Sequence, residues 1–366
     1  MKLRYLLLLG FQVMFARVAF TQKGTASQSQ NLVVITFDGV RWHEIFKGAD
    51  LSLLKDKKFN SSDSLLRIEK YWSDEPGERR SKLMPFLWNY IVKNGQLYGN
   101  RDAGNFVNVK NPYWFSYPGR SESFCGYVDT AVNSNDFPDN PNTNVFEFIN
   151  QQPLYKGKVA GFASWNVVAH ALNRNRSGMY VNVAYEEIKG DKLTPLEQFA
   201  NETQRYEPTI FGASERVDAS TFMLTKAYIQ AKHPKVIYID LGDTDEYAHE
   251  GHYDKYLDAI HNCDAMISSL WNYMQGDAFY KNNTSFVVVP DHGRGEGDKW
   301  TDHGSKTPHS NDTWILTFGA GIKHSGEIKA KGQLYNEQFA QTIAGLLGLR
   351  FNATHPVAPA IDGIIK

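Results

Sequence analysis

The sequence predicts an α/β fold with a mainly parallel central sheet and helices on both faces. Short apolar runs rich in β-branched residues are typical of buried strands, and they occur at 32–37, 159–163, 236–241, 285–289 and 314–318. Two stretches, 82–93 and 253–274, instead repeat apolar residues on one helical face. Strands that alternate with amphipathic helices indicate a parallel sheet covered on both sides, with binding sites beyond the carboxyl ends of the strands.

The remaining segments complete this organisation in chain order. Residues 99–118 and 133–144 are rich in Asn, Pro, Gly and aromatic residues, which indicates loops. Residues 165–215 mix helix and loop signals, so we expect a small cap inserted on the sheet. No internal repeat or domain linker is evident, and residues 22–366 are expected to form a single domain.

Composition restricts both the partners and the chemistry. The 366 residues include 39 basic and 40 acidic ones, for a net charge of −1, so no global positive field indicates binding to nucleic acid. The two cysteines, Cys125 and Cys263, lack the Cys-x-x-Cys spacing of a thiolate zinc site. Any metal must therefore be held by histidine and carboxylate, and the segment 249–309 is rich in histidine.

The N-terminus resembles a secretory signal. Lys2 and Arg4 precede an apolar run from Tyr5 to about Phe20, and cleavage near Thr21 would remove residues 1–21. An uncleaved anchor or a buried helix is the alternative. We expect a secreted or periplasmic protein with no membrane span once the signal is removed, because no other segment has the length and apolarity of a spanning helix.

Acidic residues stand where the predicted strands end. Asp38 follows the first strand, and Asp291 with His292 follows the strand at 285–289. After the strand at 236–241, Asp245 and His249 are four residues apart, so one helical turn could bring both to one cation, and Asp240 and Asp243 compete with Asp245. His303 and His309 are candidates for a further ligand. A ligand set of nitrogen and oxygen suits zinc best, with manganese or magnesium as alternatives.

The order of these motifs resembles the alkaline phosphatase superfamily, and within it the nucleotide pyrophosphatase/phosphodiesterase branch. The resemblance rests on FDG at 37–39, DEYAH at 245–249, PDHG at 290–293 and HG at 303–304. It implies two zinc ions, the first bound by Asp38, Asp291 and His292. It implies that the second is bound by Asp245, His249 and His303, with His309 as the alternative to His303.

The same resemblance implies a hydroxyl nucleophile in the segment YPGRSESFCGYVD. Ser121 is the predicted nucleophile and would also contact the first zinc, with Ser123 as the alternative, because Ser121 follows a Pro-Gly turn and a basic residue at the start of a helix whose amides attract phosphate. Arg120 and Asn135 are the predicted phosphate-binding residues. Asn133 and Asn142 compete with Asn135.

These residues predict a two-zinc hydrolase of small-molecule phosphoesters, a phosphodiesterase or phosphatase that acts through a phosphoserine. A phosphoglycerate mutase-like phosphotransferase and a catalytically silent zinc-containing binding module are the alternatives. A sulfatase would share the fold but normally carries Cys-x-Pro-x-Arg or its serine counterpart, which the segment from Ser121 to Cys125 does not match.

Overall fold

The computed structural model describes residues 29–60 and 64–366. The predicted signal at 1–21 lies outside these residues. Within them, no helix is both long enough and apolar enough to cross a membrane.

The described residues form an eight-stranded sheet in the order β10-β2-β9-β7-β1-β6-β4-β5, which confirms the predicted fold class. Its strands are β1 (Asn31–Phe37), β2 (Gly95–Tyr98), β4 (Val159–Ala163), β5 (Tyr180–Val183), β6 (Val236–Leu241), β7 (Thr284–Pro290), β9 (Ile315–Gly319) and β10 (Gly326–Glu327). The five strands from β7 to β5 are parallel, whereas β9 runs antiparallel to both its neighbours. A smaller sheet, β11-β3-β8, comprises β3 (Asn105–Asn108), β8 (Asp312–Thr313) and β11 (Gly332–Tyr335).

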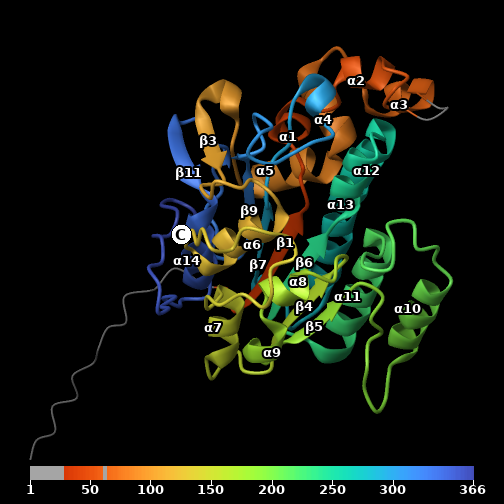
Figure 1. Cartoon of the computed structure of the whole chain (residues 1–366). Helices are drawn as coiled ribbons and strands as arrows, with labels where there is room; N and C mark the ends of the chain where they lie inside the picture. The colour runs from red at the N-terminus through yellow and green to blue at the C-terminus, as the bar shows by residue number, and fades with distance from the viewer. Residues whose placement is uncertain (1–28, 61–63) are drawn as a thin grey trace, which may run out of the picture.

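Helices cover both faces of the sheet (Figure 1). On one side lie α6 (Ser116–Cys125), α7 (Val145–Gln151) and α14 (Phe339–Leu346), and on the other α11 (Asp218–Lys232) and α13 (Tyr253–Gly276). Alternate residues of β1 explain why two cores form, because Val33 and Ile35 pack with α13 whereas Leu32 and Val34 pack with α7 and α14.

The remaining helices are short and surround these layers. They are α1 (Trp42–Lys47), α2 (Leu51–Lys55), α3 (Ser64–Tyr71), α4 (Pro76–Leu83), α5 (Val92–Asn94), α8 (Val168–Ala171), α9 (Arg174–Ser177), α10 (Pro195–Arg205) and α12 (Asp243–His249). The predicted helix at 82–93 is divided: α4 ends at Leu83, and a π-helical turn at Leu87–Ile91 precedes α5.

The segment 165–215, expected as a cap, is divided between two roles. Its strand β5 pairs with β4 and forms an edge of the main sheet, so this part is no insertion. The helix α10, by contrast, lies outside the sheet layers with long loops at both ends (Figure 1). Thr194 begins α10 with a capping box in which Glu197 reciprocates, so the helix starts through its own local hydrogen bonds.

Candidate metal centre

The register of the parallel strands brings three chain segments together. Phe37, the last residue of β1, pairs with Leu241 of β6 and with Pro290 of β7. The residues that follow these strands therefore meet at one edge of the sheet, as expected for the carboxyl ends of parallel strands. This edge holds the two groups of described residues that could bind a metal ion.

The first group consists of Asp38, Asp291 and His292, whose ligand atoms lie within 4.8 Å of one another. All three side chains are buried. His292 Nδ1 lies 2.8 Å from the carbonyl oxygen of Gly293, to which it can donate, and this directs Nε2 towards Asp38 Oδ1 at 3.2 Å. A carbonyl partner on the far nitrogen is the usual arrangement of a metal-binding histidine.

Burial and neighbouring charges shift the pKa values of the first group. Burial alone would lower the pKa of His292, but Asp291 and Asp38 outweigh it and raise this pKa to about 9. Burial raises the pKa of Asp291 to about 7. Without a metal the group therefore holds a proton that a bound cation would displace.

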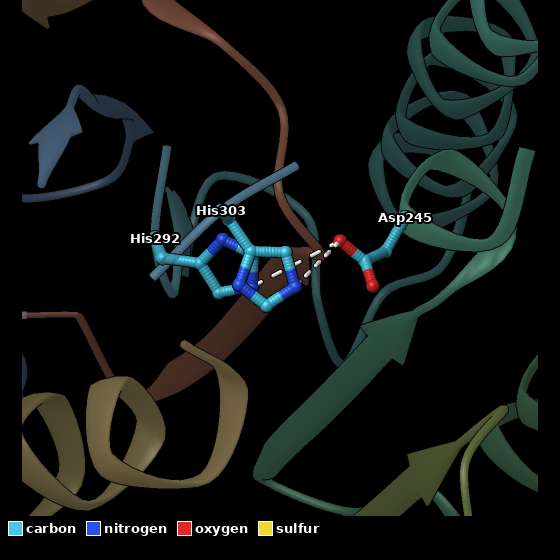
Figure 2. Close-up of side chains that lie close together, drawn as sticks. All are labelled: Asp245, His292 and His303. Carbon is cyan, nitrogen blue, oxygen red and sulfur yellow. Dashed lines mark ion pairs between the residues drawn. The ribbon is translucent and has the colours of Figure 1, made fainter. Parts of the chain in front are cut away.

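The second group contains Asp245, His292 and His303 (Figure 2). Both imidazoles face the Asp245 carboxylate, their Nε2 atoms lie 3.9 and 3.8 Å from its Oδ1, and their rings stack at 4.1 Å. The Nε2 of His249 lies 3.0 Å from both Asp245 Oδ2 and His303 Nε2. The structure therefore brings all three predicted ligands of the second metal together.

A buried arginine supports this second group. The Arg294 guanidinium contacts Asp245 Oδ1 and lies 3.4 Å from His249 Nδ1. Burial would raise the pKa of Asp245, but Arg294 and the neighbouring histidines hold it well below its usual range. Burial and the nearby His292 lower the pKa of His303, so His303 is neutral and able to coordinate at physiological pH.

The donor set fits metal ions. Among the described residues, Asp38 Oδ1 and His303 Nδ1 are buried yet make no hydrogen bond of normal geometry. Buried polar atoms are normally paired, so such atoms beside several carboxylates and imidazoles indicate that a cation completes the site. Because His292 belongs to both groups, a metal ion at each would need His249 to complete the second set with Asp245 and His303.

Ser116, rather than Ser121, lies at this centre. Ser116 is the first residue of α6, and its Oγ is 3.2 Å from His292 Nε2. Pro118 fits in the first turn of α6, because the amide nitrogens there have no carbonyl partner within the helix. A proline three residues before Ser121 was thus a sequence signal that the helix could start before Ser121.

The predicted nucleophile Ser121 and its alternative point elsewhere. The Ser121 hydroxyl is buried and accepts a hydrogen bond of 2.8 Å from Asn140 Nδ2, while Ser123 faces Asn336. Ser121 is therefore no contact of the first metal group, and this assignment is corrected. The misplacement follows from taking Pro118-Gly119 as a turn before the helix, whereas both residues lie inside α6.

Arg120 has a different environment from the one predicted. It is 1% exposed, and its guanidinium bonds to Asp38 at 2.7 Å, to Asp291 at 2.5 Å and to Asp240 through two bonds of 2.8 Å. It stands behind the first metal group and does not line the cavity in front of it. Arg120 therefore holds carboxylates, and its prediction as a phosphate ligand is corrected.

Asn135 lines the cavity in front of the first metal group. Its Oδ1 accepts a hydrogen bond of 2.9 Å from the Tyr117 amide, which leaves Nδ2 as a donor at the cavity wall. Asn142 instead donates to Asp129, and Asn133 lines only a neighbouring shallow hollow.

The remaining alternatives lie away from the second metal group. His309 binds Asp312 at 2.9 Å, Asp240 pairs with Arg120, and Asp243 accepts from the Asp218 amide.

A cavity of about 180 Å³ opens onto both groups. Its wall contains six of the residues discussed above together with five others, and the whole set is Asp38, Ser116, Asn135, Trp165, Phe211, Ser214, Glu215, Asp245, Glu246, His249 and His303. Burial, followed by the charge of Glu246, raises the pKa of Glu215 well above its usual range. The sequence analysis singled out neither glutamate, because both line a cavity that only the fold creates.

Comparisons with known proteins agree with this geometry. Residues 46–350 match the family model of the Metalloenzyme superfamily. The fold is similar to that of the alkaline phosphatase PafA, with a TM-score of 0.60 and 10% identity over 93% of this chain and 100% of that one. It is also similar to that of a 2-O GAG sulfatase, with a TM-score of 0.56 and 12% identity over 91% and 73%.

One curated relative matches locally. The Mus musculus GPI ethanolamine phosphate transferase 1 is 32% identical over 100 residues, which are 26% of this chain and 10% of that protein. The match thus spans about a tenth of the relative.

Proposed function

Because the chain belongs to the Metalloenzyme superfamily and has its alkaline phosphatase-like fold, we propose that it is a two-zinc hydrolase of phosphodiesters with Ser116 as nucleophile. The observation that carries this proposal is the Ser116 hydroxyl, which lies 3.2 Å from His292 Nε2 at the wall of a cavity shared by both metal groups. Zinc is preferred because the donor set is imidazole and carboxylate.

Each set of cavity residues has its own role in the proposed reaction. Asp38, Asp291 and His292 would hold the first metal, and Asp245, His249 and His303 the second. Bound there, the metals would favour the serine alkoxide and stabilise charge on the leaving oxygen. Ser116 Oγ forms a bond to phosphorus while the bond to the leaving alcohol breaks, and water then cleaves the phosphoserine and restores the hydroxyl. The side-chain amide nitrogen of Asn135, at the cavity wall, would hold a phosphate oxygen.

The test compares two serines of one helix. Ser116→Ala is expected to lose nitrophenyl phosphodiester turnover by roughly 10³-fold or more, since removal of a nucleophile disables the whole catalytic unit. Ser121→Ala is the control and should retain turnover within a few-fold. Elemental analysis should find two zinc ions per chain in both variants. Normal turnover in Ser116→Ala would refute the assignment, and full zinc without turnover in the unmodified protein would favour a binding module.

A sulfate ester hydrolase is the second candidate. Ser116-Tyr-Pro-Gly-Arg120 matches Ser-x-Pro-x-Arg, the serine counterpart of the sulfatase pattern, five residues upstream of the segment first compared with it. The second metal group favours phosphoesters, because a pair of metals supports both the attacking and the leaving oxygen of a phosphoryl transfer. Turnover of nitrophenyl sulfate above that of the phosphodiester, with Ser116 oxidised to formylglycine by mass spectrometry, would reverse this ranking.

Export is part of the proposal. The charged and apolar N-terminal sequence from Lys2 to Phe20 supports a secreted or periplasmic location. Cell fractionation combined with N-terminal sequencing of the mature chain tests it, and an intact Met1 on a cytosolic protein would refute it.

A further inference from the structure

The backbone segment 110–115, which leads into Ser116, contains a strained residue. Trp114 has a φ of +56°, in the left-handed region that residues other than glycine rarely adopt. Such a conformation persists only where the surrounding structure holds it, and it is most common at functional sites. Phe115, the next residue, caps α6 without a side-chain hydrogen bond. The segment must therefore be held in place by residues outside the first turn of the helix.

Asn111 holds the strained part of this segment. Its Oδ1 accepts hydrogen bonds from the amide of Tyr113 at 3.0 Å and from the amide of Trp114 at 3.2 Å. An asparagine side chain that bonds the backbone just after it is a common way to fix a turn. Asn111 is itself buried, so its orientation depends on the group that accepts from its Nδ2.

That group is Glu122, which lies further along α6 and binds back to the same segment. Its carboxylate accepts hydrogen bonds from the Lys110 amide at 2.9 and 3.0 Å, from the Asn111 amide at 2.8 Å and from Asn111 Nδ2 at 2.9 Å. The Glu337 amide donates a further bond of 3.2 Å. Hydrogen bonds to an ionised acceptor are strong, so Glu122 fixes the start of the segment.

The burial of Glu122 is costly to the protein. The residue is 1% exposed. Within the described chain no lysine or arginine forms an ion pair with it, because the Lys110 ammonium pairs with Glu337 instead, at 2.6 Å. Burial therefore raises the pKa of Glu122 to about 7. A buried carboxylate that is kept without a counter-charge is a candidate for a functional role.

Packing of α6 fixes Ser116 from its other side. Gly119 lets the helix approach the backbone of Asp291 so closely that a Cβ would lie 2.2 Å from the Asp291 carbonyl oxygen. The helix is thereby set against the segment that carries two predicted ligands of the first metal, Asp291 and His292. Ser116 stands where α6 meets the segment 110–115, so both supports determine the position of its hydroxyl.

We propose that Glu122 is a positioning residue for Ser116 and acts through Asn111 and the segment 110–115. This inference rests on the proposed function, in which Ser116 attacks phosphorus. Glu122 does not line the cavity, so its replacement should change the attack and leave binding of zinc and substrate largely intact. A displacement of about 1 Å can lower the rate of attack by roughly 100-fold.

The kinetic test replaces Glu122 by glutamine, which presents an NH₂ group to N–H donors in place of one acceptor oxygen. At about pH 8.5, Glu122→Gln is expected to lower kcat for a nitrophenyl phosphodiester by roughly 10- to 100-fold, with KM within about threefold. Two zinc ions per chain should remain. Glu147→Gln is the matched control, because Glu147 is also a buried glutamate but pairs with Arg176 on another helix, at 2.7 Å. An unchanged kcat in Glu122→Gln, or an equal loss in Glu147→Gln, would overturn the proposal.

A double mutant tests whether Glu122 acts through Asn111. Asn111→Ala alone should also lower kcat, because the amides of Tyr113 and Trp114 lose their acceptor. Residues that act along one path are not additive, so Asn111→Ala combined with Glu122→Gln should lose about as much as the weaker single variant. Losses that multiply in the double mutant would show independent roles and overturn the proposed path.

Amide hydrogen exchange separates this inference from the proposed function, since it needs no turnover. In the zinc-loaded protein, the peptide that covers 109–116 should exchange about tenfold or more faster in Glu122→Gln, and at the unmodified rate in Glu147→Gln. This result supports Glu122 as the residue that positions Ser116 even if no diester is hydrolysed, in which case only the proposed function fails. Unchanged exchange in Glu122→Gln would overturn the inference even if hydrolysis is normal.

Discussion

Replacing Arg120 by methionine should cost the metal-free protein about 3–5 kcal/mol of unfolding free energy, because removing one partner of a buried ion pair leaves uncompensated charge. Arg120 is 1% exposed and bonds to Asp38, Asp240 and Asp291 at 2.5–2.8 Å. The loss should not scale with the number of bonds. Asp291 has its pKa raised to about 7 and can take up a proton at little cost near that pH.

The stability of Arg120→Met should depend on pH. In Arg120→Met the buried carboxyls have pKa values above those of the unfolded chain, so the folded state binds more protons than the unfolded state. Its stability therefore falls as pH rises. We expect the loss to be near 3 kcal/mol at about pH 6 and near 5 kcal/mol at about pH 8, which are the two ends of the range for broken buried pairs.

The assay is urea unfolding followed by tryptophan fluorescence, with a chelator present. Arg174→Met is the matched control, because Arg174 pairs with Glu186 at 2.7 Å with both side chains 39% exposed, and its replacement should cost about 1 kcal/mol or less. Saturating zinc should recover part of the Arg120→Met loss, since the metal restores positive charge between Asp38 and Asp291. A loss below about 1 kcal/mol, or no response to zinc, would refute the reasoning.

Three further predictions concern the metal groups. Gly39→Ala should lower zinc content and turnover, because φ is +59° there and a Cβ would lie 2.6 Å from Asp245 Oδ1; unchanged zinc would contradict this. His303→Ala should lose one zinc per chain whereas His309→Ala keeps two, and the reverse result in elemental analysis would exchange their roles. Zinc affinity should fall as pH decreases from 8 to 7 by up to about tenfold, since the raised pKa of His292 means that zinc displaces a proton; chelator competition with equal affinities would argue against it.

The strands were predictable because burial on both faces leaves near-continuous apolar sequence. The predicted runs 159–163 and 236–241 match β4 and β6 residue for residue. Most metal ligands could also be predicted from the sequence. Asp38, Asp291 and His292 directly follow strands, and Asp245 and His249 are one helical turn apart. β5 was missed because a four-residue edge strand, YVNV, carries too little pattern.

Residues whose role depends on packing between distant segments could not be assigned from sequence. Arg120 was predicted to bind an anion because its three carboxylate partners cannot be identified from the neighbouring sequence. They are separated from it by 82, 120 and 171 positions. Ser116 was recoverable, because Pro118 restricts where a helix can start. Glu215 carried no local signal, since its neighbours across the cavity come from other elements.

Two buried arginines contact the carboxylates of the metal groups. Arg120 stands behind Asp38 and Asp291, and Arg294 contacts Asp245, so each metal group has a fixed positive charge on its protein side. These charges orient the carboxylates before any metal arrives, which reduces the reorganisation that binding requires. The residues that line the cavity, by contrast, are carboxylates, imidazoles, aromatic rings and small polar side chains, so both guanidiniums contact the metal ligands from the side away from the cavity.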